Sequence, residues 1–273
     1  MIEINNLSFH HKKQKTLFNN LTYKQTSGSI TGLLGKNGAG KSTLLKLSAG
    51  LLHPKQGSII INGYTPSNRN PDFLADIFLV SDEPYLPSLT VASYLAIYAP
   101  LYKNFDLEKM SKILKEFELE AHQKLDGISH GQQKKFIIAF ALSTNCKLLL
   151  LDEPTNGLDI PSKSIFRKVL ISSVEEDQLV VISTHQVKDI ETIIDKIVII
   201  EEGTIVFEKE TQLVTEKLQF QKLESISENS NIIYSEKCPG GYNAILPANN
   251  DEETEIDIEL LFNAICNKTE IKL

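Results

Sequence analysis

The sequence predicts an α/β fold whose sheet is mostly parallel, with an antiparallel β part, a helical subdomain and a small α+β appendage at the C-terminal end. Three near-continuous apolar runs, at residues 147–151, 179–182 and 196–200, end in polar residues. Such runs are typical of strands in a parallel sheet, because that sheet is covered on both faces. A further apolar run at 30–34 leads through a glycine-rich loop into a helix-forming stretch, so this segment is predicted to be strand, loop and helix.

Shorter patterns predict the elements around this sheet. Short apolar patches separated by polar turns predict antiparallel strands ahead of the loop strand. These patches lie at 2–4, 7–9 and 21–23. Residues 58–63 are predicted to form a strand that ends in a turn. From about residue 90 to residue 143 the pattern is mainly helical, and the apolar residues of 109–119 recur on one helix face.

We expect two parts along the chain. The first covers residues 1–210 and contains the helical subdomain at about 84–145. A shift in composition then introduces the appendage, residues 211–273. Within it, Pro239-Gly240-Gly241 predicts a hairpin turn, and the apolar spacing of 258–266 predicts a helix.

Composition and charge argue against several classes of protein. The chain has 273 residues and a hydrophobic content of 41%, which suffices for a substantial core. Its formal net charge of −7 argues against nucleic acid as a partner, since nucleic-acid binding usually needs a basic surface. The three cysteines are far apart, so neither a disulfide framework nor a zinc site is expected. No signal peptide and no apolar run long enough to cross a bilayer is recognisable, and we expect a cytoplasmic protein.

The glycine-rich loop has the spacing G-x-x-x-x-G-K-S of a phosphate-binding loop. Its glycines allow a tight turn that aims backbone N–H groups inward, and the following helix adds the positive end of its dipole. Lys41 is predicted to reach the β- and γ-phosphates of a nucleotide, and Ser42 to bind Mg²⁺. The alternative is a glycine-rich surface turn. The residues predicted to bind the nucleotide are Gly35, Lys36, Asn37, Gly38, Ala39, Gly40, Lys41, Ser42 and Thr43.

Two carboxylates follow one of the buried strands. Asp152 and Glu153 come directly after the apolar run 148–151, at the sheet edge where ligands bind in this class of fold. Asp152 is predicted to hold Mg²⁺ opposite Ser42. Glu153 is predicted to orient an attacking water or accept its proton. The alternative is an acidic turn before Pro154.

With these elements the chain resembles the ATP-binding subunit of an ABC transporter, a P-loop NTPase of the ABC type. Residues 128–132 read Ile-Ser-His-Gly-Gln, where that family carries a signature that is commonly Leu-Ser-Gly-Gly-Gln. The resemblance implies that Ser129, Gly131 and Gln132 complete the ATP site of a second subunit in a head-to-tail dimer. Gly157-Leu158-Asp159 matches the loop through which the two subunits touch.

The resemblance also implies a role for one histidine, and the sequence departs from the family pattern at two positions. His185, at the end of the apolar run 179–182, stands where the family's switch histidine contacts the γ-phosphate; a structural histidine is the alternative. Ser81 stands where the family usually has a glutamine, and Asp82 beside it is the candidate for the metal contact. The aromatic residue that stacks on adenine is replaced by His11, with Phe9 as second choice.

The family resemblance covers about residues 1–210 and implies ATP hydrolysis that drives a separate membrane permease, with ATP and Mg²⁺ as cofactors. We expect an exporter on the inner face of the cell membrane, a homodimer formed on ATP binding, and a permease docked on residues 81–102. The appendage is expected to regulate or to dimerise. The rivals are a soluble ABC-type ATPase, a nucleotide switch that barely hydrolyses ATP, and a small-molecule kinase. The transported substrate cannot be read from the sequence.

Overall fold

A six-stranded, mostly parallel sheet forms the centre of the computed structural model, which describes residues 2–12, 15–26, 28–226, 231–248 and 254–271. Its strand order is β5-β6-β7-β3-β8-β9, and β9 alone of these strands pairs antiparallel. The strands are β3 (Ser29–Leu34), β5 (Ile77–Val80), β6 (Leu148–Asp152), β7 (Leu179–Thr184), β8 (Lys196–Glu201) and β9 (Thr204–Glu210). Every residue of β6 and β7 is buried, as their apolar runs predict.

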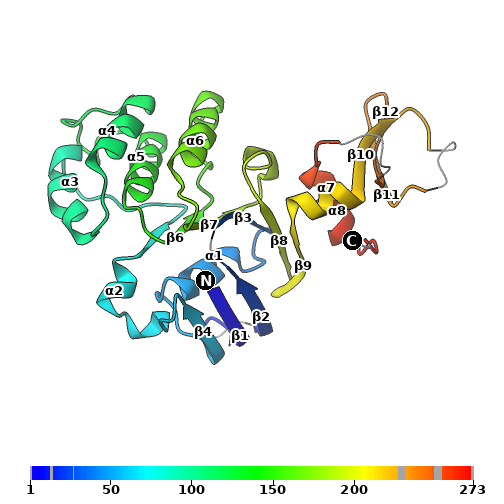
Figure 1. The fold of residues 1–273 in the computed structure, drawn as a ribbon, viewed down its shortest axis with the longest axis horizontal. Helices are drawn as coiled ribbons and strands as arrows, with labels where there is room; N and C mark the ends of the chain where they lie inside the picture. Colours follow the sequence, from blue (N-terminus) through cyan, green and yellow to red (C-terminus); the bar gives the residue numbers. More distant parts are fainter. Residues whose placement is uncertain (1, 13–14, 27, 227–230, 249–253, 272–273) are drawn as a thin grey trace.

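A second, antiparallel sheet of order β2-β1-β4 covers one face of the first, and α1 (Lys41–Ser48) lies between the two (Figure 1). Its strands are β1 (Ile2–Phe9), β2 (Phe18–Gln25) and β4 (Gln56–Ile61). The patches 2–4 and 7–9 belong to one strand, because its register shifts between Ile4 and Leu7 and Asn6 has a φ of +49°. This irregularity keeps apolar residues on the buried face although they leave the alternate spacing of a regular strand.

Helices cover the other face of the parallel sheet and gather at one end of the molecule (Figure 1). They are α3 (Val91–Tyr98), α4 (Leu107–Glu116), α5 (His130–Ser143) and α6 (Ile160–Ser173), with the short α2 (Pro71–Leu74) beside β5. Phe140 on α5 centres an aromatic cluster, with the rings of Phe78, Tyr94 and Phe105 at 5.6, 5.2 and 5.0 Å. This packing anchors the helical subdomain on the sheet.

The helix predicted over 109–119 begins and ends earlier than expected. Asp106 caps its N-terminus by accepting a hydrogen bond from the backbone N–H of Lys109, which moves the start of α4 to Leu107. The helix ends before Phe117, and Glu118 has a φ of +56°. That left-handed conformation interrupts the helix although the apolar pattern continues.

The C-terminal appendage holds a three-stranded antiparallel sheet and two helices on the β9 side of the molecule (Figure 1). Its elements are α7 (Thr211–Lys217), β10 (Leu218–Leu223), β11 (Tyr234–Cys238), β12 (Gly241–Pro247) and α8 (Ile258–Cys266). The hairpin and the last helix lie where the sequence predicts them. One hydrophobic cluster runs from the main sheet into the appendage and includes Ile190, Ile194 and Leu261. Among the described residues, no helix combines the length and apolarity that a membrane span requires.

Candidate functional site

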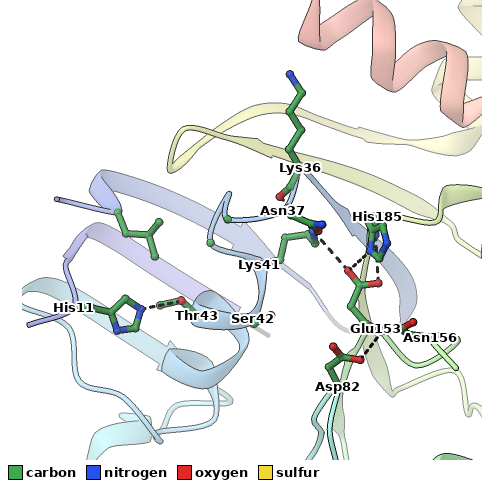
Figure 2. A pocket seen from close by; sticks show the side chains of 13 residues that line it. His11, Lys36, Asn37, Lys41, Ser42, Thr43, Asp82, Glu153, Asn156 and His185 are labelled. Carbon is green, nitrogen blue, oxygen red and sulfur yellow. Dashed lines mark hydrogen bonds and ion pairs between the residues drawn. The ribbon is translucent and has the colours of Figure 1, made fainter. Parts of the chain in front are cut away.

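The phosphate-binding loop borders a cleft of about 560 Å³ at the carboxyl ends of the parallel strands (Figure 2). The cleft joins residues that are far apart in the sequence and come from the loop, from the segments after β5, β6 and β7, and from the N-terminal sheet. It is lined by His11, Leu17, Lys36, Asn37, Gly38, Gly40, Lys41, Ser42, Thr43, Asp82, Glu153, Asn156 and His185. Gly35, Ala39 and Asp152 do not line the cleft. Gly35 and Asp152 accept hydrogen bonds from the lining residues Lys41 and Ser42, and Ala39 is buried within the loop.

The backbone of the loop requires glycine at its last turn. Gly40 is the N-cap of α1 with a φ of +108°, a conformation that favours glycine. A Cβ atom at Gly40 would lie 2.6 Å from the ring of Phe18, so a larger residue would have to displace this buried side chain of β2. The loop and the first turn of α1 are thereby held against the N-terminal sheet.

Lys41 is almost fully buried and folds back over the loop. Its Nζ donates hydrogen bonds to the carbonyl oxygens of Gly35 at 2.7 Å and Lys36 at 3.4 Å, and lies 3.7 Å from Oε1 of Glu153. Burial lowers the pKa of Lys41, and the nearby charges of Glu153 and Asp152 oppose that effect. The loop therefore presents a positive charge at the floor of the cleft before any nucleotide binds.

Ser42 and Asp152 form the part of the site that fits a divalent cation. Oγ of Ser42 donates to Oδ1 of Asp152 at 2.9 Å, and the hydroxyl of Ser183 donates to the same oxygen. A hydroxyl and a carboxylate are ligands that Mg²⁺ prefers, and Mg²⁺ usually takes its other ligands from water and substrate phosphates. The described part of the chain holds no group of three or more acidic, histidine or cysteine side chains suited to a metal.

Glu153 and His185 lie together, as the positions of their strands predict. Nδ1 of His185 lies 2.8 Å from Oε1 of Glu153, and because a carboxylate only accepts, this nitrogen carries the proton. The other oxygen of Glu153 accepts from Oγ1 of Thr184 at 3.1 Å and from the backbone N–H of His185 at 3.4 Å. The carboxylate thus has a fixed orientation at the edge of the cleft (Figure 2).

The signature residues lie outside this cleft. Ser129 is the N-cap of α5 and forms a capping box with Gln132, in which each side chain accepts from the other residue's backbone N–H. A Cβ atom on Gly131 would lie 3.0 Å from the carbonyl oxygen of Gly157. The signature and the loop at 157–159 therefore form one surface, and the contribution of Ser129, Gly131 and Gln132 to a second subunit's site stays a prediction.

The two departures from the family pattern have clear positions. The hydroxyl of Ser81 donates a hydrogen bond to the carbonyl oxygen of Glu83 at 3.1 Å. Asp82 lines the cleft, and its Oδ1 accepts from the side chains of Asn156 and Lys134 at 3.1 Å each. Asp82 as a metal ligand stays a prediction. Sequence reasoning missed Lys134 and Asn156, because a lysine within a helix and an asparagine in a turn usually lie on the surface and carry no signal of a site.

His11 lies at the mouth of the cleft on the side of α1. Its Nε2 is 3.4 Å from Oγ1 of Thr43, and its ring meets Phe9 edge-on with the centroids 5.0 Å apart. Phe9 is buried and presents no face to the cleft. His11 is therefore the better placed of the two for adenine, and its stacking stays a prediction; Leu17 beside it carried no signal in the sequence.

Comparison with known proteins decides the family. Residues 18–156 match the family model described as ABC transporter. The chain is 31% identical over 228 residues to the SkfA peptide export ATP-binding protein SkfE of Bacillus subtilis, covering 81% of this chain and 94% of the relative. The chain belongs to the ABC transporter family. A second relative is the zinc uptake system ATP-binding protein ZurA of Listeria monocytogenes. It is 34% identical to this chain over 245 residues, which cover 84% of this chain and 93% of the relative.

Solved structures agree with this assignment to the ABC transporter family. An ATP-binding subunit of an ABC transporter matches with a TM-score of 0.69 and 25% identity, over 78% of this chain and 91% of that one. The cbiO1 protein from Clostridium perfringens, part of the transporter complex cbiONQ, matches with a TM-score of 0.65 and 26% identity, over 78% and 89%. The fold is that of an ABC ATPase, and the reaction of this ATP-binding subunit is hydrolysis of ATP to ADP and phosphate, coupled to transport.

Proposed function

We propose that the chain binds ATP with Mg²⁺ in the cleft beside the phosphate loop and uses its hydrolysis to drive a separate membrane permease that exports its substrate. The observation that carries this proposal is that Lys41, after β3, and Glu153, after β6, form an ion pair in one cleft that is open to solvent. A lysine that can bind phosphate and a carboxylate that can orient water are two of the parts that catalyse phosphoryl transfer to water.

Each side chain has a role in this reaction. The loop N–H groups and Lys41 bind the phosphates and stabilise the charge that develops on them. Ser42 and Asp152 would hold Mg²⁺, which when bound neutralises phosphate charge. Glu153 orients the attacking water and accepts its proton. Because Nδ1 of His185 donates to Glu153, the opposite ring nitrogen is left to face the γ-phosphate.

A second copy of the chain is proposed to complete the site. Ser129 and Gly131 lie outside their own cleft, which fits a role at the cleft of a partner. Beside them, Ile160 follows the loop at 157–159 and is 84% exposed. An exposed isoleucine next to this surface supports contact with another subunit.

The permease is proposed to dock in a second, mainly apolar cleft of about 930 Å³ between α1, α2 and the segment after α3. Leu74, Leu79 and Leu101 contribute apolar walls, and Leu101 is 62% exposed. Lys46 and Arg69 add positive charge at its edge, where Lys103 is paired with Asp72 at 3.2 Å. This combination suits a short amphipathic helix with an apolar face and acidic ends, presented by the permease on the inner side of the membrane.

Export is the proposed direction of transport, and the relative named for peptide export supports it. Relatives named for zinc uptake and for molybdate import are of similar identity, so the direction needs an assay. Inverted membrane vesicles supplied with ATP on the outside should accumulate the substrate. Accumulation in right-side-out vesicles instead would identify an importer.

The C-terminal appendage is proposed to regulate the site through the segment that follows His185. The backbone N–H of Ile258, at the start of α8, donates to Glu191 at 2.7 Å, and Lys188 pairs with Glu259 at 2.7 Å. Burial raises the pKa of Glu191. The helix of the appendage is thereby tied to the chain only a few residues beyond the candidate switch histidine.

Replacing Glu191 tests this regulatory contact. Glu191→Ala removes one charge-assisted hydrogen bond, worth about 1.5–3 kcal/mol to local stability. The turnover of ATP should fall by about 3- to 10-fold, since substitutions between coupled sites change the coupling by about 0.5–2 kcal/mol. Glu216→Ala, an exposed change on α7 of the same appendage, is the matched control. Equal turnover in both variants would contradict a regulatory link.

Removing the candidate base tests the proposed reaction. Glu153→Gln keeps the shape of the side chain but cannot accept the proton of water, so kcat should fall by about 10²- to 10⁴-fold while ATP still binds. The variant should also accumulate as an ATP-bound dimer in light scattering. The control is Glu118→Gln, an exposed glutamate that shares the positive φ of Glu153. Wild-type turnover no faster than that of Glu153→Gln would instead favour a nucleotide switch.

Co-purification from solubilised membranes tests whether the partner is a membrane permease. The wild-type chain should co-purify with a polytopic membrane protein, and Leu101→Glu should weaken that capture by about tenfold or more, since a buried leucine contributes about 1.5–3 kcal/mol. Ile171→Glu, at a residue on α6 that is 57% exposed, is the control for an added surface charge. Capture of soluble assemblies only, or equal capture by both variants, would argue against permease docking in this cleft.

A further inference from the structure

A buried lysine from the signature helix reaches the candidate base, and the proposed reaction does not use it. Lys134 lies on α5, five residues beyond the N-cap Ser129, and its side chain has no exposed surface. A lysine is almost never fully buried unless its charge is paired. The partners of Lys134 therefore indicate why it is there.

The ammonium group of Lys134 has three acceptors on two other segments. Nζ donates to the backbone carbonyl and to Oδ1 of Asp82, the latter at 3.1 Å, and to the backbone carbonyl of Glu153 at 2.9 Å. Three acceptors match the three donors of an ammonium group. Lys134 thus joins α5 to the segment after β5 and to the segment after β6, where both acceptor residues line the nucleotide cleft.

The contact with Glu153 acts on a strained backbone. Glu153 has a φ of +46°, a conformation that residues other than glycine rarely adopt. Its backbone N–H donates to the carbonyl oxygen of Ser183 at 2.9 Å, and its own carbonyl accepts from Lys134. The same carbonyl also accepts from the backbone N–H of Asn156 at 3.2 Å. Both backbone polar groups of Glu153 are therefore held, and they place the residue whose carboxylate is oriented by Thr184 and His185.

We infer that Lys134 is a positioning residue that holds Glu153 in its working orientation and links it to the helix carrying Ser129 and Gly131. Movement of α5 would carry the ammonium group with it and change the support of the Glu153 peptide. A flat guanidinium would not reach three converging acceptors in the same way. An apolar side chain would remove all three bonds from Lys134 and leave Asn156 as the remaining donor to Oδ1 of Asp82 and to the carbonyl of Glu153.

The charge environment is consistent with this arrangement. Burial lowers the pKa of Lys134, whereas the hydrogen bond and charge of Asp82, together with the charges of Asp152 and Glu153, work in the opposite direction. Asp82 in turn accepts from Asn156. The lysine is therefore one member of a network whose other members all border the nucleotide site.

The inference rests on the proposed role of Glu153, and a double-variant experiment separates the two. Lys134→Met removes the ammonium group at similar length and should lower kcat by about 10- to 100-fold, as the loss of supporting contacts does at other catalytic sites. The affinity for ATP, measured with a fluorescent analogue, and KM should change less than about threefold, because the phosphate loop is untouched. Lys135→Met, at the next and partly exposed residue of α5, should behave as wild type.

In a Glu153→Gln background, Lys134→Met should cost little further turnover, since Lys134 acts through Glu153. Equal fold-losses in both backgrounds, or an unchanged kcat, would overturn the inference. If Lys134→Met fails to fold, Lys134→Gln, whose amide keeps two N–H donors but no charge, replaces it. A parallel loss of ATP affinity and kcat in that variant would show a merely structural lysine. Full turnover in Glu153→Gln itself would instead refute the proposed function.

Discussion

The ion pair between Lys41 and Glu153 is the interaction on which the rest of the site depends. Their charged atoms lie 3.7 Å apart, and both side chains are nearly buried. A buried charge without a partner is costly, and removing one member of such a pair is worse than replacing both. Glu153 therefore balances Lys41 in the protein alone, and a triphosphate, which carries more negative charge, would compete with it for the same ammonium group. We therefore expect binding of substrate and release of the Glu153 carboxylate to be one event.

The parallel sheet makes this pair possible. Because β3, β6 and β7 run side by side in the same direction, their carboxyl ends deliver the loop, the two carboxylates and His185 to one edge. Strands that are buried on both faces leave the backbone little freedom there. The positive φ of Glu153 is tolerated because its N–H bonds to Ser183 and its carbonyl accepts from Lys134 and from the backbone N–H of Asn156. The packing that stabilises the core therefore also fixes the geometry of the site.

The sequence predicted the parallel sheet, the phosphate loop and the helix 258–266, because long apolar runs and a spaced glycine motif depend on local chemistry. It did not single out β5, which has four residues, or the irregular turn within β1, which only pairing with β2 and β4 defines. Lys134 and Asn156 were missed for a different reason. Their partners lie 52 and 74 residues away in the chain, and no pattern within a helix or a turn encodes contacts at that separation.

A structure of the chain bound to Mg²⁺ and a non-hydrolysable ATP analogue tests the central claim most directly. We expect Nζ of Lys41 to leave Glu153 and contact the β- and γ-phosphates, and the loop N–H groups to point at the same phosphates. The Glu153 carboxylate should turn toward the position of the attacking water. An analogue bound elsewhere, or one bound beside the loop with the Lys41–Glu153 pair still closed, would contradict it.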